Sequence, residues 1–246
     1  MKVQEILNEK ILSKLEKGIV PWVKPWTCTA YNAETGRKYS GANWLILNGP
    51  YLTMKQVQKL GGTVKKGCKA EQVFFWQILE KEKDGKVETI PFFKYYSVFK
   101  LEDCDVALAP TNFEPKHLSE FDAILERHSI ETFTSHVAGL YSDQRISMPQ
   151  RSSFAEPEGY YQTLAHELIH WTGKPLERKM DVYAFEELVA EIGGAMLLSE
   201  FGITPNIENV SAYCAGWGSK IKADVNMINR AATKAKQAVE YLINER

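Results

Sequence analysis

The sequence predicts an α+β protein of two domains, residues 1–112 and 113–246. Stretches with apolar residues at helical spacing alternate with shorter runs of β-branched and aromatic residues, which are typical of strands. The charge is divided unevenly, because residues 1–112 carry 17 Lys and Arg against 12 Asp and Glu, and the remainder carries 13 against 19. Residues 108–115 contain two prolines and form the best linker. A basic half joined to an acidic half favours two modules with different partners.

The bulk composition excludes several classes of protein. The 246 residues are 44% hydrophobic, which is ordinary for a protein with a proper core. No run approaches the roughly 18 apolar residues of a membrane span, and the acidic start lacks the apolar run of a signal peptide. We therefore expect a cytoplasmic protein with no membrane partner. The four cysteines are widely scattered, which argues against a disulfide framework or a cysteine zinc site.

In the N-terminal half, helical spacing and capping signals predict helices, and β-formers on both sides of an Asp-Gly turn predict a hairpin. The prolines of the Pro21–Trp26 segment exclude a helix there and indicate an extended arm that presents two indoles. The predicted order is a helix at 3–15, the arm at 21–26, a short helix ending at 47, a capped helix at 53–60, and strands at 72–79 and 88–101.

Basic and aromatic side chains alternate through this half. Single-stranded nucleic acid is held by cations that follow its phosphates and by aromatic faces that stack on its bases. The alternative is that the rings are core residues and the lysines ordinary surface. Trp76 and Tyr96 belong to the pattern, and the candidate DNA-binding residues are Trp22, Lys24, Trp26, Arg37, Lys38, Tyr39, Trp44, Lys65 and Lys66.

In the C-terminal half, the same reasoning predicts a helix at 117–127, strands at 132–138 and 140–148, two long helices, and further helices from 210 to 246. The first long helix contains His166-Glu167-x-x-His170 and ends at Gly173. Residues four apart share a helix face, so both imidazoles reach the same point and are candidate zinc ligands. Glu167 is placed to act as the general base toward a metal-bound water.

A zinc site of this kind needs a third protein ligand. The second long helix, residues 183–198, is apolar except for carboxylates that include Glu187 and Glu191, four apart on one face. Buried carboxylates are costly unless paired or metal-bound, so one should bind the metal and the other should orient a ligand histidine. The spacing matches the second metal helix of gluzincins, in which the first acid is the ligand. We predict Glu187 as the ligand and Glu191 as its support, with the reverse assignment left open.

The chain resembles the ArdC-type antirestriction proteins. The motifs that carry the resemblance are Pro21-Trp22-x-Lys24-Pro25-Trp26, Thr35-Gly36-Arg37-x-Tyr39-x-Gly41-x-Asn43, the His166–Gly173 stretch and Glu186-Glu187-Leu188-Val189-Ala190-Glu191. The resemblance implies an N-terminal domain that binds single-stranded DNA, with Asn43 added to its candidate residues, and a C-terminal zincin-like metallopeptidase domain. In zincins, a strand just upstream of the metal helix holds an extended substrate by backbone pairing, and residues 140–148 are placed for this role.

The predicted function is therefore single-stranded-DNA binding that protects incoming mobile DNA from host restriction, with a zinc metallopeptidase-type domain whose hydrolysis is not required for protection. Two alternatives remain open at this point. One is a non-enzymatic DNA-protecting protein whose metal is only structural. The other is a cytoplasmic zinc metalloprotease that acts on a specific protein substrate, with the N-terminal domain as a targeting module.

Overall fold

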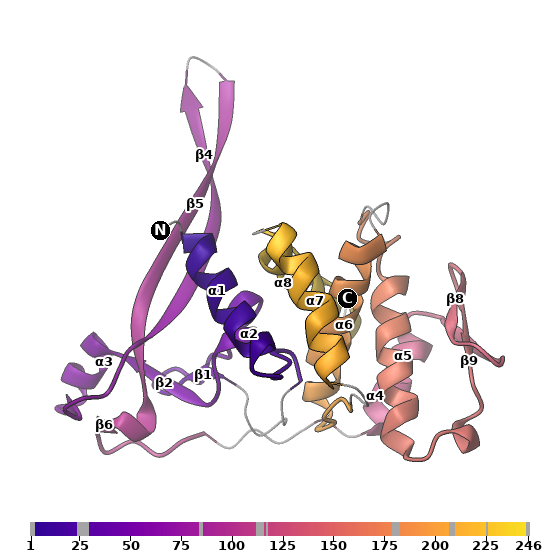
Figure 1. Ribbon diagram of the computed structural model, residues 1–246, viewed down its shortest axis with the longest axis horizontal. Coiled ribbons are helices and arrows are strands. Elements are labelled where there is room, and N and C mark those ends of the chain that lie inside the picture. Colours follow the sequence, from indigo (N-terminus) through magenta and orange to yellow (C-terminus); the bar gives the residue numbers. More distant parts are fainter. Residues whose placement is uncertain are drawn as a thin grey trace.

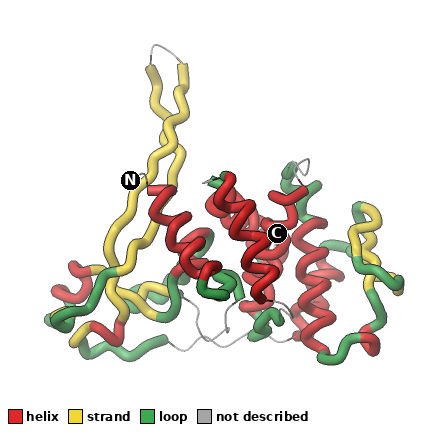
Figure 2. The backbone as a smooth tube through the Cα atoms, viewed as in Figure 1, coloured by secondary structure: helices red, strands yellow, loops and turns green. Residues whose placement is uncertain are grey.

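Helices and strands are mixed along the chain, as the predicted α+β class requires (Figure 1). The computed structural model describes residues 3–23, 30–83, 86–111, 116, 118–178, 183–206, 210–224 and 226–244. Its first part is built around strands and its last part is a group of helices (Figure 2). Within the described residues, no helix is both long and apolar enough to cross a membrane.

A four-stranded sheet organises the first part, with the strand order β1-β2-β5-β4. Its long β4–β5 hairpin is antiparallel and stands out from the rest of the molecule (Figure 1). Both predicted hairpin strands are confirmed, with β4 running four residues further than expected. The strands are β1 Tyr31–Asn32, β2 Pro50–Thr53, β4 Glu71–Lys83 and β5 Lys86–Lys100.

Short helices flank this sheet. Thr53 caps α3 in the predicted way, because its hydroxyl accepts a hydrogen bond from the Gln56 amide and the Gln56 side chain accepts one from the Thr53 amide. A second, two-stranded sheet lies beside α3 (Figure 1). These elements are α1 Val3–Glu16, α2 Ala42–Ile46, α3 Met54–Lys59, β3 Thr63–Val64, the 3-10 helix Leu101–Asp103 and β6 Cys104–Asp105.

The second part begins with α4, Leu118–Arg127, and a three-stranded sheet in the order β7-β9-β8. Its strands are β7 Glu131–Thr134, β8 Gly139–Ser142 and β9 Arg145–Met148. The prediction of one strand over 140–148 is wrong, because a turn at residues 143–144 folds that segment into β8 and β9. β9 lies in the centre of the sheet, so β8 is the strand of this segment that lies at an edge, where an extended peptide could pair with it; β7 forms the other edge.

Four long helices complete the chain, and α6 packs against both α5 and α8 (Figure 1). They are α5 Pro157–Trp171, α6 Tyr183–Glu200, α7 Val210–Ala223 and α8 Met227–Ile243, joined to the small sheet through the 3-10 helix Arg151–Ser153. Pro157 opens α5, where its missing N–H costs nothing. Both metal-bearing helices predicted from the motifs are therefore present.

One hydrophobic core spans both halves of the chain. Leu7 and Ile11 of α1 belong to the same buried cluster as Leu188 of α6 and Ile228 of α8. Accordingly, α1 packs on α7 and α2 on α8. The predicted division at residue 112 stays a prediction, and half of the predicted linker, residues 112–115, lies outside the described residues.

Two indoles predicted to stack on DNA are core residues instead. Trp22 is 1% exposed and Trp44 is 8% exposed. The Trp22 indole N–H donates to the Tyr213 hydroxyl at 3.1 Å, and its ring packs edge-on against Tyr213 and Trp217 of α7. The prediction that these rings are exposed is wrong, because α7 and the shared core cover them. Lys24 and Trp26 lie outside the described residues.

Candidate metal centre

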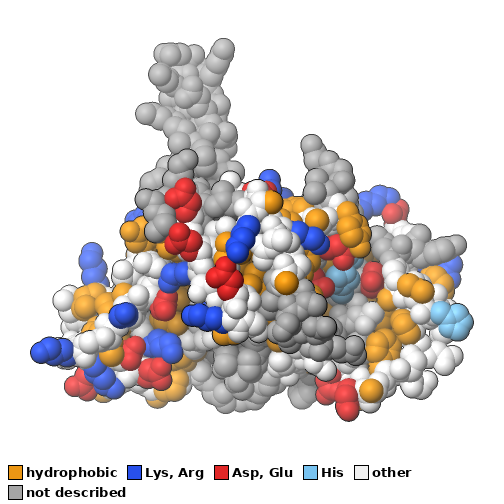
Figure 3. Space-filling model, viewed as in Figure 1, with side chains coloured by type: hydrophobic (Ala, Val, Ile, Leu, Met, Phe, Trp, Pro, Cys, Tyr) orange, Lys and Arg blue, Asp and Glu red, His pale blue; other side chains and the backbone are white. Residues whose placement is uncertain are grey.

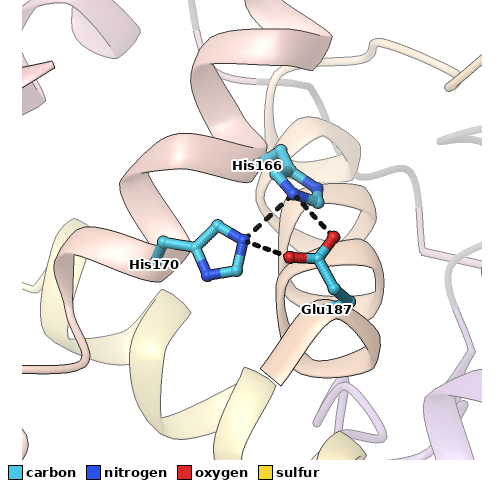
Figure 4. Close-up of side chains that lie close together, drawn as sticks. All are labelled: His166, His170 and Glu187. Carbon is cyan, nitrogen blue, oxygen red and sulfur yellow. Dashed lines mark hydrogen bonds and ion pairs between the residues drawn. The ribbon is translucent and has the colours of Figure 1, made fainter. Parts of the chain in front are cut away.

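His166 and His170 lie one turn apart on α5 and point toward the same place (Figure 4). Their Nε2 atoms are 3.1 Å apart. Glu187 approaches from α6, with one carboxylate oxygen 3.4 Å from Nε2 of His170 and the other 3.7 Å from Nε2 of His166. The three side chains that were predicted as ligands therefore lie close together. One nitrogen or oxygen atom from each lies within 4.8 Å of the other two.

These separations fit a metal ion. Zinc binds imidazole nitrogen and carboxylate oxygen at about 2.0–2.2 Å, so two ligands at a tetrahedral angle should be about 3.3 Å apart. The observed 3.1, 3.4 and 3.7 Å bracket that value. Two imidazoles and one carboxylate are also the donor set of a catalytic site that keeps its fourth position for water. The three side chains therefore suit zinc in both chemistry and spacing.

Two adjacent glycines let α6 approach α5 closely enough for this. A Cβ atom at Gly193 would lie 2.9 Å from the side chain of Ile169, which is too close for a real contact. At Gly194 it would lie 3.4 Å from the backbone nitrogen of His166. Larger residues at these two positions would push α6, and Glu187 with it, away from the histidines.

A buried ion pair between Glu186 and Arg178 contacts His170 on the Nδ1 side of its imidazole. Glu186, which is 3% exposed, lies 3.3 Å from Nδ1 of His170. Arg178 donates to both Glu186 oxygens, from Nε at 2.9 Å and from Nη2 at 2.6 Å. It also donates to the Thr172 hydroxyl and to the Ile169 carbonyl. With Nδ1 engaged by Glu186, Nε2 of His170 is the nitrogen that faces the metal position.

The charges around His170 set the direction of its pKa. Burial lowers the pKa of this imidazole, but the hydrogen bond with Glu186 and the charge of Glu187 outweigh burial and raise it. Burial likewise raises the pKa of the Glu186 carboxyl, but the hydrogen bonds from His170 and Arg178 outweigh it and lower that pKa. Glu186 is therefore a carboxylate at neutral pH.

Glu191 has the corresponding place beside the other histidine. One of its oxygens lies 4.0 Å from Nδ1 of His166, and the other accepts a hydrogen bond from Tyr213 at 2.6 Å. Burial, followed by the charge of Glu191, raises the pKa of the Tyr213 phenol, so Tyr213 stays a neutral donor. Glu191 thus lies beside His166 and its supporting role stays a prediction, while Glu186 was not foreseen.

Glu167 borders a cavity of about 210 Å³ next to the metal centre. The same cavity is lined by His166, Glu191 and, from the N-terminal half, Trp22. In the space-filling view, a histidine lies at the surface to the right of the middle of this face, with acidic side chains beside it (Figure 3). The predicted general base thus lies where solvent and a substrate can reach it.

The remaining predicted residues are distributed differently. Arg37, Lys38, Tyr39 and Asn43 line a groove of about 540 Å³, whereas Lys65 and Lys66 are exposed next to β3 and are not part of its lining. Both polar atoms of the Asn43 side chain bond the backbone of Phe74 at 2.7 Å. Asn43 therefore links α2 to β4, and its predicted contact with DNA stays a prediction.

Comparisons with known proteins identify two families along the chain. A family model for zincin-like metallopeptidases matches residues 119–234, and a model for the N-terminal domain of anti-restriction factor ArdC matches residues 1–99. The DNA primase TraC of Escherichia coli is 29% identical over 287 residues, and the match covers 97% of this chain but 20% of the primase. The chain thus spans about one fifth of that relative's length.

Two solved structures are similar over nearly their whole length. The metal-free crystal structure of the antirestriction ArdC protein from the R388 plasmid is 32% identical, with a TM-score of 0.81, and the match covers 98% of this chain and 97% of that one. The Mn(II)-bound structure of the same protein is 31% identical, with a TM-score of 0.80 and the same coverage.

Proposed function

Because this chain belongs to the ArdC family of antirestriction proteins, we propose that it binds single-stranded DNA and carries a zinc metallopeptidase centre. The DNA is that of an incoming mobile element, which the bound protein protects from restriction. The observation that carries the metallopeptidase part is the convergence of His166, His170 and Glu187 at tetrahedral spacing. The proposed ligands are these three residues.

Zinc is the proposed metal although the Mn(II)-bound relative demonstrates that another divalent ion fits a member of the family. Affinity for divalent ions rises from manganese toward copper and remains higher for zinc than for manganese at nitrogen-rich sites. Two imidazoles and a single carboxylate form such a site. Manganese prefers more oxygen ligands, so this donor set favours zinc.

The proposed reaction is hydrolysis of a peptide bond in a protein substrate. The metal, when bound, polarises the substrate carbonyl and lowers the pKa of a water. Glu167 takes a proton from that water and then passes it to the leaving amine. Glu186 orients the imidazole of His170, and Glu191 orients that of His166, so that both Nε2 atoms face the metal. A substrate side chain can enter the cavity that Glu167 borders.

Elemental analysis of the dialysed protein tests the metal part of the proposal. We expect close to one zinc per chain, loss of that zinc in His166→Ala, and retention in Glu167→Ala, because Glu167 is not a ligand. Full zinc content in His166→Ala would contradict the proposed ligand set. Hydrolysis of a protein substrate should disappear in Glu167→Ala, because the substitution removes the proposed general base and keeps the three proposed ligands.

Protection of DNA should not depend on hydrolysis, because coating a strand requires no bond to be cut. Intact protein and Glu167→Ala are compared for protection of DNA against a restriction enzyme. Equal protection supports a shield that works without hydrolysis. Loss of protection by a folded, DNA-binding Glu167→Ala protein would make proteolysis the mechanism instead.

A further inference from the structure

The groove near Arg37 is bounded by both halves of the chain. One wall consists of the segment around Arg37 and the base of the β4–β5 hairpin. The other wall is α8, which contributes Asn229, Thr233 and Lys236. Helices α2 and α8 are packed together beneath it. Residues nearly 200 positions apart in the sequence therefore face one open space of about 540 Å³.

Two aromatic rings in this groove are exposed where a soluble protein would normally bury them. Phe75 is 46% exposed and Tyr96 is 37% exposed. Val73 pairs with Tyr96, and Phe75 with Lys94, in the antiparallel register of β4 and β5. Directly paired residues lie on the same face of a sheet, so Phe75 and Tyr96 are diagonal neighbours on one face. Two adjacent exposed rings form a stacking platform for unpaired bases.

The charge of the lining points to a polyanion. Among the described residues that line the groove, Arg37, Lys38 and Lys236 are cationic and none is acidic, although the whole chain has a net charge of −1. Lys38 and Lys236 are held by ion pairs with Glu200 and Glu240 at 3.0 and 3.5 Å. A phosphate can take the place of a carboxylate on such a lysine, and each phosphate neutralised releases counterions from the strand.

We propose that single-stranded DNA lies in this groove, with bases against Phe75 and Tyr96 and phosphates near Arg37, Lys38 and Lys236. Helix α8 of the metallopeptidase half is then part of the DNA site. This inference rests on the proposed DNA binding and adds its location. Duplex DNA is excluded from the same contacts, because its base faces are stacked on each other and cannot meet the two rings.

The test measures fluorescence anisotropy of a labelled oligothymidylate, about 12 nucleotides long to match a typical site, with the full-length protein. Lys236→Glu should weaken binding roughly tenfold. It should also make the salt dependence weaker, with the negative slope of log affinity against log salt reduced in magnitude by about 1. Phe75→Ala should weaken binding roughly 5- to 100-fold through lost stacking. Lys222→Glu is the matched control, because Lys222 of α7 also loses a surface ion pair, with Glu16, and lies outside the groove lining.

Lys236→Gln, which removes the charge without reversing it, should give a smaller loss in the same direction. Circular dichroism of each variant establishes that it is folded. Wild-type affinity in folded Lys236→Glu and Phe75→Ala would overturn the location while leaving DNA binding intact. Failure of the unaltered protein to bind the oligonucleotide would overturn the proposed DNA binding itself, and the location with it.

Discussion

Replacing Arg178 with methionine should destabilise the protein strongly. The Arg178 and Glu186 side chains are 2% and 4% exposed, so water does not compensate either charge. The substitution removes both hydrogen bonds to Glu186 and the bonds to Thr172 and the Ile169 carbonyl. Among the described residues, Glu186 is then left as a buried carboxylate whose hydrogen-bond partner is His170.

Breaking a buried ion pair by removing one partner costs about 3–5 kcal/mol. In a chain of 150–250 residues, each kcal/mol lowers the melting temperature by about 2–4 °C. We therefore expect Arg178→Met to melt roughly 6–20 °C below the unaltered protein. Replacing Glu186 by leucine in the same chain removes the unpaired charge, and most of the loss should be recovered.

Thermal unfolding followed by circular dichroism, in metal-free buffer at neutral pH, measures this difference. Lys174→Met is the matched control, because Lys174 pairs with Asp143 at an exposed site where an ion pair contributes about 0–1 kcal/mol. The reasoning is refuted if Arg178→Met melts within about 3 °C of the unaltered protein, or if the double variant is less stable than Arg178→Met alone.

Three further predictions follow from neighbouring contacts. Glu187→Ala should lose the bound metal while Glu191→Ala keeps it, as measured by elemental analysis, and the opposite result would exchange the roles of the two acids. Trp22→Ala should lower the free energy of unfolding by about 3–5 kcal/mol in a urea titration, because the ring is core, and unchanged stability would contradict its burial. Tyr213→Phe removes the donor to Glu191 and should weaken zinc affinity about tenfold in competition with a chelator; unchanged affinity would exclude a role in orienting His166.

The three side chains proposed as metal ligands could be brought together from sequence because their geometry is local. The spacing of four residues is enough to place His166 and His170 on one helix face. Carboxylates on an otherwise apolar helix need a charged partner or a metal, because burying them alone is costly. The same reasoning did not predict a role for Glu186. This residue is adjacent to the proposed ligand Glu187, so its side chain projects about 100° away around the helix. Its partner Arg178 comes from the segment between the helices, and helical spacing carries no information about such a contact.

The exposure of the candidate DNA-binding residues was harder to predict, because burial depends on distant parts of the chain. Trp22 follows a proline, as an exposed arm residue would, but Tyr213 and Trp217 of α7 cover it. Helix α8 of the C-terminal half likewise lines the groove that contains Arg37, to which it contributes Lys236. Charge and aromatic content predicted which half of the chain contains the exposed rings Phe75 and Tyr96. The contribution of α8 to the groove depends on how that helix packs, which the sequence pattern did not predict.

The most direct test of the metal centre is an anomalous difference map collected at the zinc absorption edge from crystals grown with zinc. We expect one strong peak about 2.0–2.2 Å from Nε2 of His166, Nε2 of His170 and a carboxylate oxygen of Glu187. Glu186 and Glu191 should stay outside bonding distance of that peak. A peak bonded to Glu191 in place of Glu187, or no peak between the two histidines, would contradict the proposed centre.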